Sequence, residues 1–210
     1  YELDITNRKA KESKVSQEVY EMITRLDRER IETHLVVQCA PMISGMKVSN
    51  LLNVEKKLAP QMKPVLERSG ISHYLLLESE DKATFLVYRK DGLKAYLMQD
   101  RVCQSMKSFG YESLDLNDVL SCFQKRYADC MEQIAEFPHE MGLLLGYPVE
   151  DVEGFIENKG HNYLYSGYWK VYGHVEEKKA LFNRYEEARK ILIQLLASGR
   201  SVSEMASCYA

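Results

Sequence analysis

The chain has 210 residues, of which 45% are hydrophobic and 28% charged, and its formal net charge at pH 7 is −3. This length suits one or two domains with enough buried surface to fold without disulfides or a structural metal. The small acidic excess argues against a nucleic-acid scaffold, which needs a clear basic excess. The most apolar stretch, residues 141–149, is about half the ~20 residues that a membrane helix requires, so we expect neither a membrane nor a nucleic-acid partner.

The N-terminal segment and the cysteines indicate the compartment. Residues 1–14 are charged, show no apolar period and contain no signal core, so we interpret them as a disordered or frayed lead-in. We expect residues 15–210 to form a single soluble, cytoplasmic domain. An odd set of cysteines without a C-x-x-C pair is typical of reduced thiols in such a protein. The set is Cys39, Cys103, Cys122, Cys130 and Cys208.

Apolar spacing predicts the elements of the N-terminal third. Residues 15–26 repeat apolar side chains at three- and four-residue steps, which predicts an amphipathic helix. Residues 34–39 form a short run with β-branched side chains that ends before Ala40-Pro41, which predicts a buried strand. We expect residues 43–52 to be a loop that opens a short helix, and residues 58–66 to be a helix broken near its prolines.

A hairpin and two helices are predicted next. The β-rich runs 73–78 and 84–89 are separated by a polar turn, which is typical of a β-hairpin. A helical stripe then runs from residue 91 to 110, where glycine ends it. Asp115 or Asn117 is expected to cap the following amphipathic helix.

The C-terminal third is predicted to hold short helices at 138–146 and 149–158, a strand at 161–172 and a long helix that ends at Gly199. A capping box, Ser201-x-x-Glu204, begins a last short helix. The order of elements lacks simple βαβ alternation. We therefore predict an α+β fold, a single domain with a small mixed sheet of about four strands covered by helices.

His139 and Glu140 follow Pro138, at the expected positive end of a helix. This position favours a neutral imidazole beside an ionised carboxylate, a pair that can serve as general base, metal ligand or hydrogen-bond donor. The structural alternative is that Glu140 interacts with the helix N-terminus and His139 fixes a loop. Leu143 stands where a zinc protease has its second histidine, and no other ligand spacing is present. We therefore expect no metal.

Cys39 ends the strand predicted at residues 34–39. Its thiol is a candidate nucleophile if His139 folds close to it. The alternative is a buried cysteine that packs as a small apolar residue.

The predicted strand at 161–172 has one polar face, and its members are candidates for ligand binding. If the face is covered, Lys170 needs a carboxylate or a bound anion to neutralise it. If the strand is an exposed edge, Lys170 is a solvated residue that prevents edge pairing. The candidates on this face are Asn162, Tyr168, Lys170 and Tyr172.

Three strings in the chain, FPHEMGLLLGYPVEDVEGFIENKG, SGYWKVYG and ETHLVVQCAPMISGMK, resemble the signature of bacterial domain-of-unknown-function family 3793. The resemblance implies a bacterial, soluble, single-domain protein without implying an activity. It also implies a redox-linked context and a flavodoxin-like partner. Turns and close packing account for most of the signature glycines and prolines. Four signature residues lack such a role, and they are Cys39, His139, Glu140 and Lys170.

Two hypotheses follow. In the first, the chain is a small-molecule or cofactor-binding protein with a redox-linked role and an unidentified cofactor. Cys39, His139 and Glu140 are its candidate catalytic residues, and the polar face around Lys170 holds the ligand. In the alternative, the chain is a non-catalytic interaction module that binds a partner, or a second copy of itself, through the Tyr/Trp-rich strand. The sequence does not decide whether the protein is an enzyme.

Overall fold

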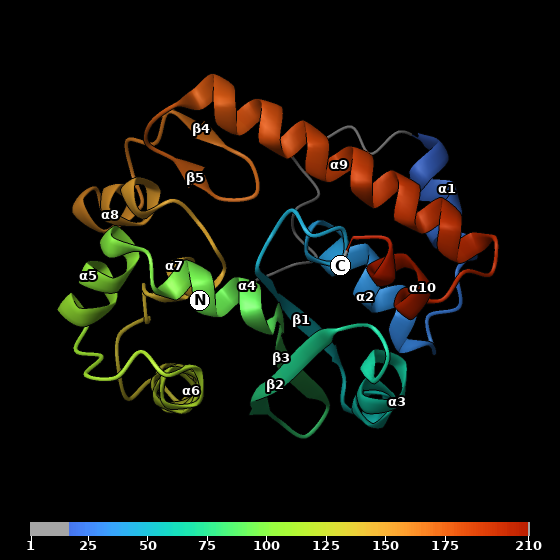
Figure 1. Cartoon of the computed structure of the whole chain (residues 1–210), viewed down its shortest axis with the longest axis horizontal. Helices are drawn as coiled ribbons and strands as arrows, with labels where there is room; N and C mark the ends of the chain where they lie inside the picture. The colour runs from blue at the N-terminus through green and yellow to red at the C-terminus, as the bar shows by residue number, and fades with distance from the viewer. Residues whose placement is uncertain (1–16, 210) are drawn as a thin grey trace.

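The central sheet has three antiparallel strands in the order β1-β3-β2, formed by β1 (Ser49–Glu55), β2 (Ile71–Glu78) and β3 (Lys82–Arg89) (Figure 1). The structure is a computed structural model that describes residues 17–209, so the lead-in predicted at 1–14 lies outside the described residues. The β2–β3 hairpin confirms the prediction from its two β-rich runs. The strand β1 is a correction, because the sequence predicts a loop and a short helix there.

The segment predicted as a strand at residues 34–39 is helical and lies within α2 (Ile31–Ile43), so that prediction is wrong. Its apolar side chains are buried on several sides, because α2 packs against both α9 (Val175–Ala197) and β1. A helix buried all round has the same uninterrupted apolar sequence as a buried strand, and periodicity does not distinguish them.

Helices cover both faces of the sheet. The predicted caps are confirmed: Asp115 accepts a hydrogen bond from the Asn117 N–H at the start of α6, and Ser201 and Glu204 form the capping box of α10. The helix predicted from 91 to 110 is interrupted after residue 97 and forms two helices. The other elements are α1 (Gln17–Arg25), the 3-10 helix η1 (Lys56–Gln61), α3 (Met62–Leu66), α4 (Lys90–Leu97), α5 (Asp100–Ser108), α6 (Leu116–Met131), α7 (Met141–Leu144), α8 (Val149–Glu157) and α10 (Val202–Ser207).

Alternate residues of β3 point into two hydrophobic cores on opposite faces of the sheet. Phe85 and Val87 pack in a core with α2, α9 and α10, whereas Leu86 and Tyr88 pack in a core with α4 to α8. Figure 1 shows α2 and α10 on one side of the sheet and α5 and α6 on the other. The central strand is therefore buried on both faces, and each edge strand has one outer side.

The strand predicted over residues 161–172 is wrong in its extent. Only β4 (Tyr165–Ser166) and β5 (Lys170–Val171) pair, as a separate two-stranded hairpin. At its turn, a Cβ on Gly167 would lie 2.4 Å from the ring of Phe182, so only glycine fits this approach to α9. The α+β class and its helical cover are confirmed. The sheet is antiparallel with three strands, and the hairpin stands apart from it.

The outer edge of β1 is closed by a side chain of α2. The Gln38 amide donates to the Asn53 carbonyl at 2.9 Å and accepts from the Asn53 N–H at 3.0 Å. The Asn50 side chain donates to the Gln38 backbone carbonyl at 3.0 Å. Gln38 thus supplies at Asn53 the two hydrogen bonds that a neighbouring strand would make, which blocks strand pairing at this point of the edge.

Candidate functional site

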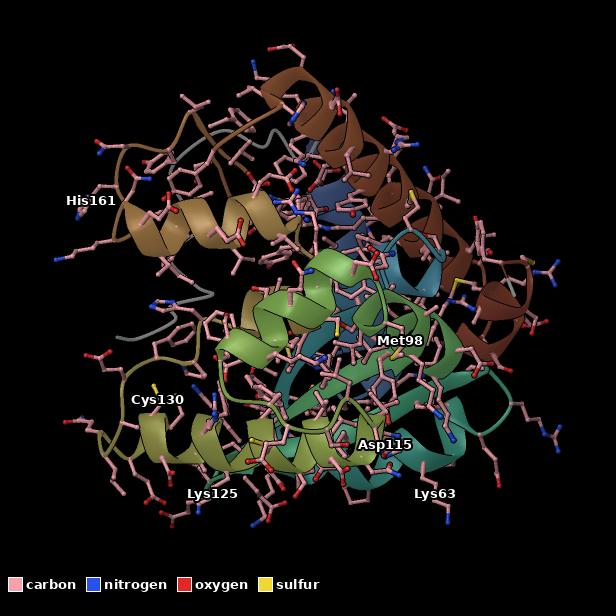
Figure 2. All side chains as sticks on the ribbon, turned by 60° about the vertical axis from the view of Figure 1, so that its left-hand side comes forward. Lys63, Met98, Asp115, Lys125, Cys130 and His161 are labelled. Atoms are coloured by element: carbon pink, nitrogen blue, oxygen red, sulfur yellow. The ribbon has the colours of Figure 1, made fainter. Side chains whose placement is uncertain are left out.

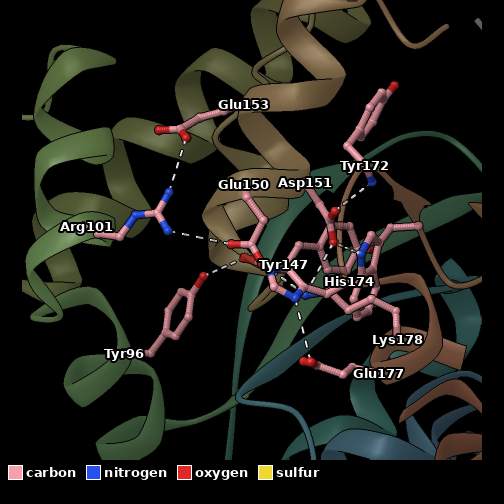
Figure 3. Close-up of polar contacts among 11 residues, drawn as sticks. Tyr96, Arg101, Tyr147, Glu150, Asp151, Glu153, Tyr172, His174, Glu177 and Lys178 are labelled. Carbon is pink, nitrogen blue, oxygen red and sulfur yellow. Dashed lines mark hydrogen bonds and ion pairs between the residues drawn. The ribbon is translucent and has the colours of Figure 1, made fainter. Parts of the chain in front are cut away.

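The buried carboxylate of Asp151, in the first turn of α8, joins three elements (Figure 3). One oxygen accepts from the Trp169 indole N–H at 2.7 Å, and the other accepts from the Tyr172 backbone N–H at 2.8 Å. The Lys178 ammonium of α9 lies 3.8 Å away. Asp151 is only 2% exposed, so these partners are what makes its burial possible. The carboxylate therefore fixes the β4–β5 hairpin between α8 and α9.

A chain of ion pairs leads from Lys178 to the surface (Figure 3). Lys178 contacts Glu150 at 3.1 Å, and Arg101 of α5 lies 3.9 Å from Glu150 and 3.5 Å from Glu153. Burial acts to raise the pKa of Glu150, but its backbone N–H and Lys178 outweigh burial and the pKa is lowered. The exposed end of this chain contributes little to stability, because solvent screens it.

Trp169 also packs against the Gly-Tyr-Pro turn that precedes α8. Its ring stacks on the ring of Tyr147, with 4.7 Å between the ring centroids. The Lys47 ammonium lies 5.2 Å from the centre of the same Tyr147 ring. The Tyr96 hydroxyl donates to the Tyr147 carbonyl at 2.7 Å. A Cβ on Gly146, which has φ 71°, would lie 2.9 Å from Val48. These signature residues therefore have structural roles.

Glu140 is buried and neutralised within the fold. It accepts hydrogen bonds from Arg126 at 2.9 Å and from the Tyr111 hydroxyl at 3.2 Å. The guanidinium of Arg126 lies 4.9 Å from the Tyr111 ring. Burial, with Glu140 as a second cause, raises the pKa of Tyr111. The Glu140 side chain makes no capping hydrogen bond to α7, so the predicted interaction with the helix N-terminus is replaced by the pair with α6.

Cys39 and His139 lie among different neighbours. The Cys39 thiol is completely buried, with the Leu51 carbonyl and the Asn50 amide each 3.7 Å from its sulfur. Burial raises the pKa of Cys39 to about 12. The ring of His139 instead contacts two phenylalanines. Within residues 17–209 no hydrogen bond or ring contact joins the thiol to the imidazole.

Of the four residues predicted to share a polar face, Asn162, Lys170 and Tyr172 contact α8 or the residue that ends it, and Tyr168 instead turns to α9. Tyr168 donates to Glu186 of α9 at 2.8 Å. The ring of Tyr172 fills the space left by the missing side chain of Gly154. Its hydroxyl is buried without a hydrogen-bond partner in the described part of the chain. Asn162 donates to the Asn158 side chain at 3.2 Å.

Two of the predicted residues do come together, at a surface that joins His139 to Lys170. His139 lies between Phe137 and Phe155, with ring centroids 5.7 and 5.6 Å apart. The Lys170 ammonium lies 5.5 Å from the Phe155 ring and 5.0 Å from the Tyr163 ring. We call these five side chains the ring surface. Phe137, Phe155 and Tyr163 were not predicted as site residues, and the aromatic content of residues 137–172 is the sequence signal that points to them.

The loop at residues 158–164 presents one end of the ring surface in a fixed shape. Lys159, Gly160 and Asn162 have φ of 50°, 73° and 55°. Residues other than glycine rarely adopt this left-handed backbone conformation. The loop is held by Lys170, which donates to the Gly160 carbonyl at 2.7 Å, and by a backbone hydrogen bond from His161. Figure 2 shows His161 on the outside of the molecule, beyond the end of α8.

Two hollows in the surface lie elsewhere. One, of about 400 Å³, lies beside the start of β2, and the other, of about 230 Å³, lies beside Tyr111 and Cys122. None of the seven predicted site residues lines either hollow. Within residues 17–209, no three His, Cys, Asp or Glu side chains are grouped as metal ligands. No helix of the same residues is long and apolar enough to cross a membrane.

Comparison with protein families matches residues 35–206 to the family described as "Protein of unknown function (DUF3793)". Neither the curated proteins nor the solved structures contain a match to the chain.

We expect Asp151→Asn to lower the free energy of unfolding by about 3 kcal/mol, because the change breaks a buried ion pair. It should also shift the emission of Trp169, the one tryptophan of the chain. Chemical denaturation followed by fluorescence measures both effects. The control is Glu153→Gln, at a half-exposed ion pair, which we expect to change stability by no more than ~0.5 kcal/mol. Equal effects of the two substitutions would contradict the role of Asp151.

We expect Cys39 to remain unmodified when native protein is treated with iodoacetamide at neutral pH, whereas exposed Cys208 reacts. Burial raises the pKa of the Cys39 thiol from 9.0 to about 12, so the unfolded state loses this proton first as the pH rises. The contribution of Cys39 to the free energy of unfolding is therefore present below about pH 9 and is lost as the pH rises towards 12. Peptide mass mapping measures the modification. Labelling of Cys39 as fast as that of Cys208 would contradict its burial and its raised pKa.

Proposed function

We propose that this chain, which belongs to the DUF3793 family of proteins of unknown function, is a non-catalytic protein-interaction module. Its recognition site is the ring surface, and its partner is a protein that places an acidic side chain against Lys170. The Tyr/Trp-rich hairpin supports this site from within, because Trp169 is only 8% exposed. The ring surface therefore takes Lys170 from the hairpin and Tyr163 from the loop before it, and it does not include Trp169.

The observation that carries the proposal is the setting of Lys170. Its ammonium contacts one carbonyl and two rings, all of them neutral, and no carboxylate pairs with it in the described part of the chain. A half-buried ammonium without a carboxylate retains its attraction for an anionic side chain. Tyrosine, which Tyr163 supplies here, is also one of the residues enriched at the energetic centres of protein interfaces.

Exposed apolar side chains extend the ring surface. Leu164, the residue after Tyr163, is 65% exposed, and within the ring surface Tyr163 is 45% and Phe137 37% exposed. A partner that covers these side chains removes apolar area from water, which is the main favourable contribution to most protein association. The hydrogen bonds of the 158–164 loop fix the shape of the surface, so little conformational entropy is lost on binding.

The cofactor-linked hypothesis has less support. A nucleophilic thiol and its general base need near hydrogen-bond contact and an accessible thiolate. Cys39 has a raised pKa, no exposed surface and no contact with His139. Both Glu140 hydrogen bonds come from groups within the fold. We therefore propose no reaction and no cofactor for this chain.

The first partner to test is a flavodoxin-like protein, the class that the family resemblance implies. We expect Tyr163→Ala and Lys170→Met each to weaken its binding to the full chain at least tenfold, measured by biolayer interferometry. Met98→Ala is the matched control, because Met98 is 66% exposed and lies well apart from His161 (Figure 2). If this candidate does not bind, a photo-crosslinking residue at position 164 identifies the partner in cells, and the purified partner is measured with the same variants.

Two results would contradict the proposal. One is a partner, found by either route, that binds the Tyr163 and Lys170 variants as tightly as the wild type. The other is a rise in the unfolding temperature with FMN, haem or a nucleotide, since a ligand that binds the folded state stabilises it. The second result would favour the cofactor-linked hypothesis instead.

A further inference from the structure

Among the described residues, side chains close the outer edge of β2 at two points. The Ile71 N–H donates to the Ser69 hydroxyl at 3.1 Å, and the Leu75 carbonyl accepts from the Gln124 side chain of α6 at 2.7 Å. Beyond Leu75 the register of the β2–β3 pair shifts at a bulge, which ends the regular edge. The open part of the edge is therefore short and centred on His73.

The strand register places the backbone groups of His73 on this outer edge. Arg89 N–H donates to Val48, on the β1 side of the sheet, so Tyr88 and Leu86 bond towards β2, opposite Ser72 and Tyr74. Alternate residues of an antiparallel strand bond to opposite sides, so the N–H and C=O of His73 point outward with those of Ile71 and Leu75. Neither group of His73 has a hydrogen-bond partner within residues 17–209.

The hollow beside this edge carries more positive than negative charge. Its lining includes Lys63, Lys90 and Glu67, and none of the three forms an ion pair with another described residue. The hollow has a volume of about 400 Å³, which leaves room for side chains of an added segment. Burial lowers the pKa of His73, so its imidazole adds no charge at neutral pH. The local excess therefore favours an acidic occupant.

We propose that the open edge of β2 binds an extended acidic segment of a partner protein, which adds to the sheet as a short antiparallel strand opposite His73. The residue facing His73 exchanges two backbone hydrogen bonds with it, and the residues two positions before and after that residue bond to the Leu75 N–H and the Ile71 C=O. A second copy of β2 is disfavoured, because a symmetric pair would bring the lysines of the two copies together. This edge is distinct from the ring surface.

The test uses a fluorescein-labelled peptide, Glu-Val-Glu-Val-Glu with blocked ends, and the full chain. We expect saturable binding by fluorescence anisotropy, and slowed hydrogen exchange at the His73 and Leu75 amides. N-methylation of the central glutamate should weaken binding of the peptide at least tenfold. The peptide Lys-Val-Lys-Val-Lys should also bind at least tenfold more weakly than the glutamate peptide. The double variant Lys63→Glu/Lys90→Glu should prefer the lysine peptide. Lys107→Glu/Lys125→Glu, with two exposed lysines elsewhere, should bind like the wild type.

Three outcomes would overturn the proposal. The first is no binding of the glutamate peptide, and the second is binding that leaves the His73 and Leu75 amides unprotected. The third is concentration-dependent dimerisation that protects these amides without peptide, which would assign the edge to a second copy. Tyr163→Ala should bind the peptide normally, so failure here and failure of the ring surface are distinguishable.

Discussion

The buried carboxylate of Asp151 is the interaction on which the proposed recognition surface depends. Both of its oxygens accept hydrogen bonds from the β4–β5 hairpin, and Lys178 of α9 lies beside it. A buried carboxylate is stable only when it is paired and hydrogen-bonded. Removing the Asp151 carboxylate therefore disturbs the packing of α8, the β4–β5 hairpin and α9 at the same time. The same hairpin carries Lys170, which holds the 158–164 loop. The shape of the ring surface therefore follows from a charge buried behind it.

The elements predicted correctly from sequence are those with local signals. The Ser201–Glu204 capping box, the Asp115 cap and the β2–β3 hairpin are specified by residues a few positions apart. The error at α2 has a different origin, because its burial against α9 and β1 removes the polar side from its sequence pattern. The strand predicted at 161–172 fails because the chain turns between Ser166 and Lys170, where Gly167 packs against Phe182 of α9.

The candidate site was predictable in part. The aromatic and charged density of residues 137–172 located the region, and His139 and Lys170 both contact Phe155. The pairing of Glu140 with Arg126, and the seclusion of Cys39 beneath β1, depend on how helices pack across the sheet. A single sequence contains no local signal for such pairings. The open edge at His73 likewise emerges only when the register of all three strands is known.

Amide hydrogen exchange of Asp151→Asn beside the wild type tests the central claim most directly. If the buried carboxylate organises the hairpin and the loop, the variant loses protection over residues 160–172 and keeps it in β1, β2 and β3. Uniform loss across the chain would mean that Asp151 contributes only to global stability. Unchanged protection over residues 160–172 would mean that the ring surface does not depend on it, and either result would contradict this account.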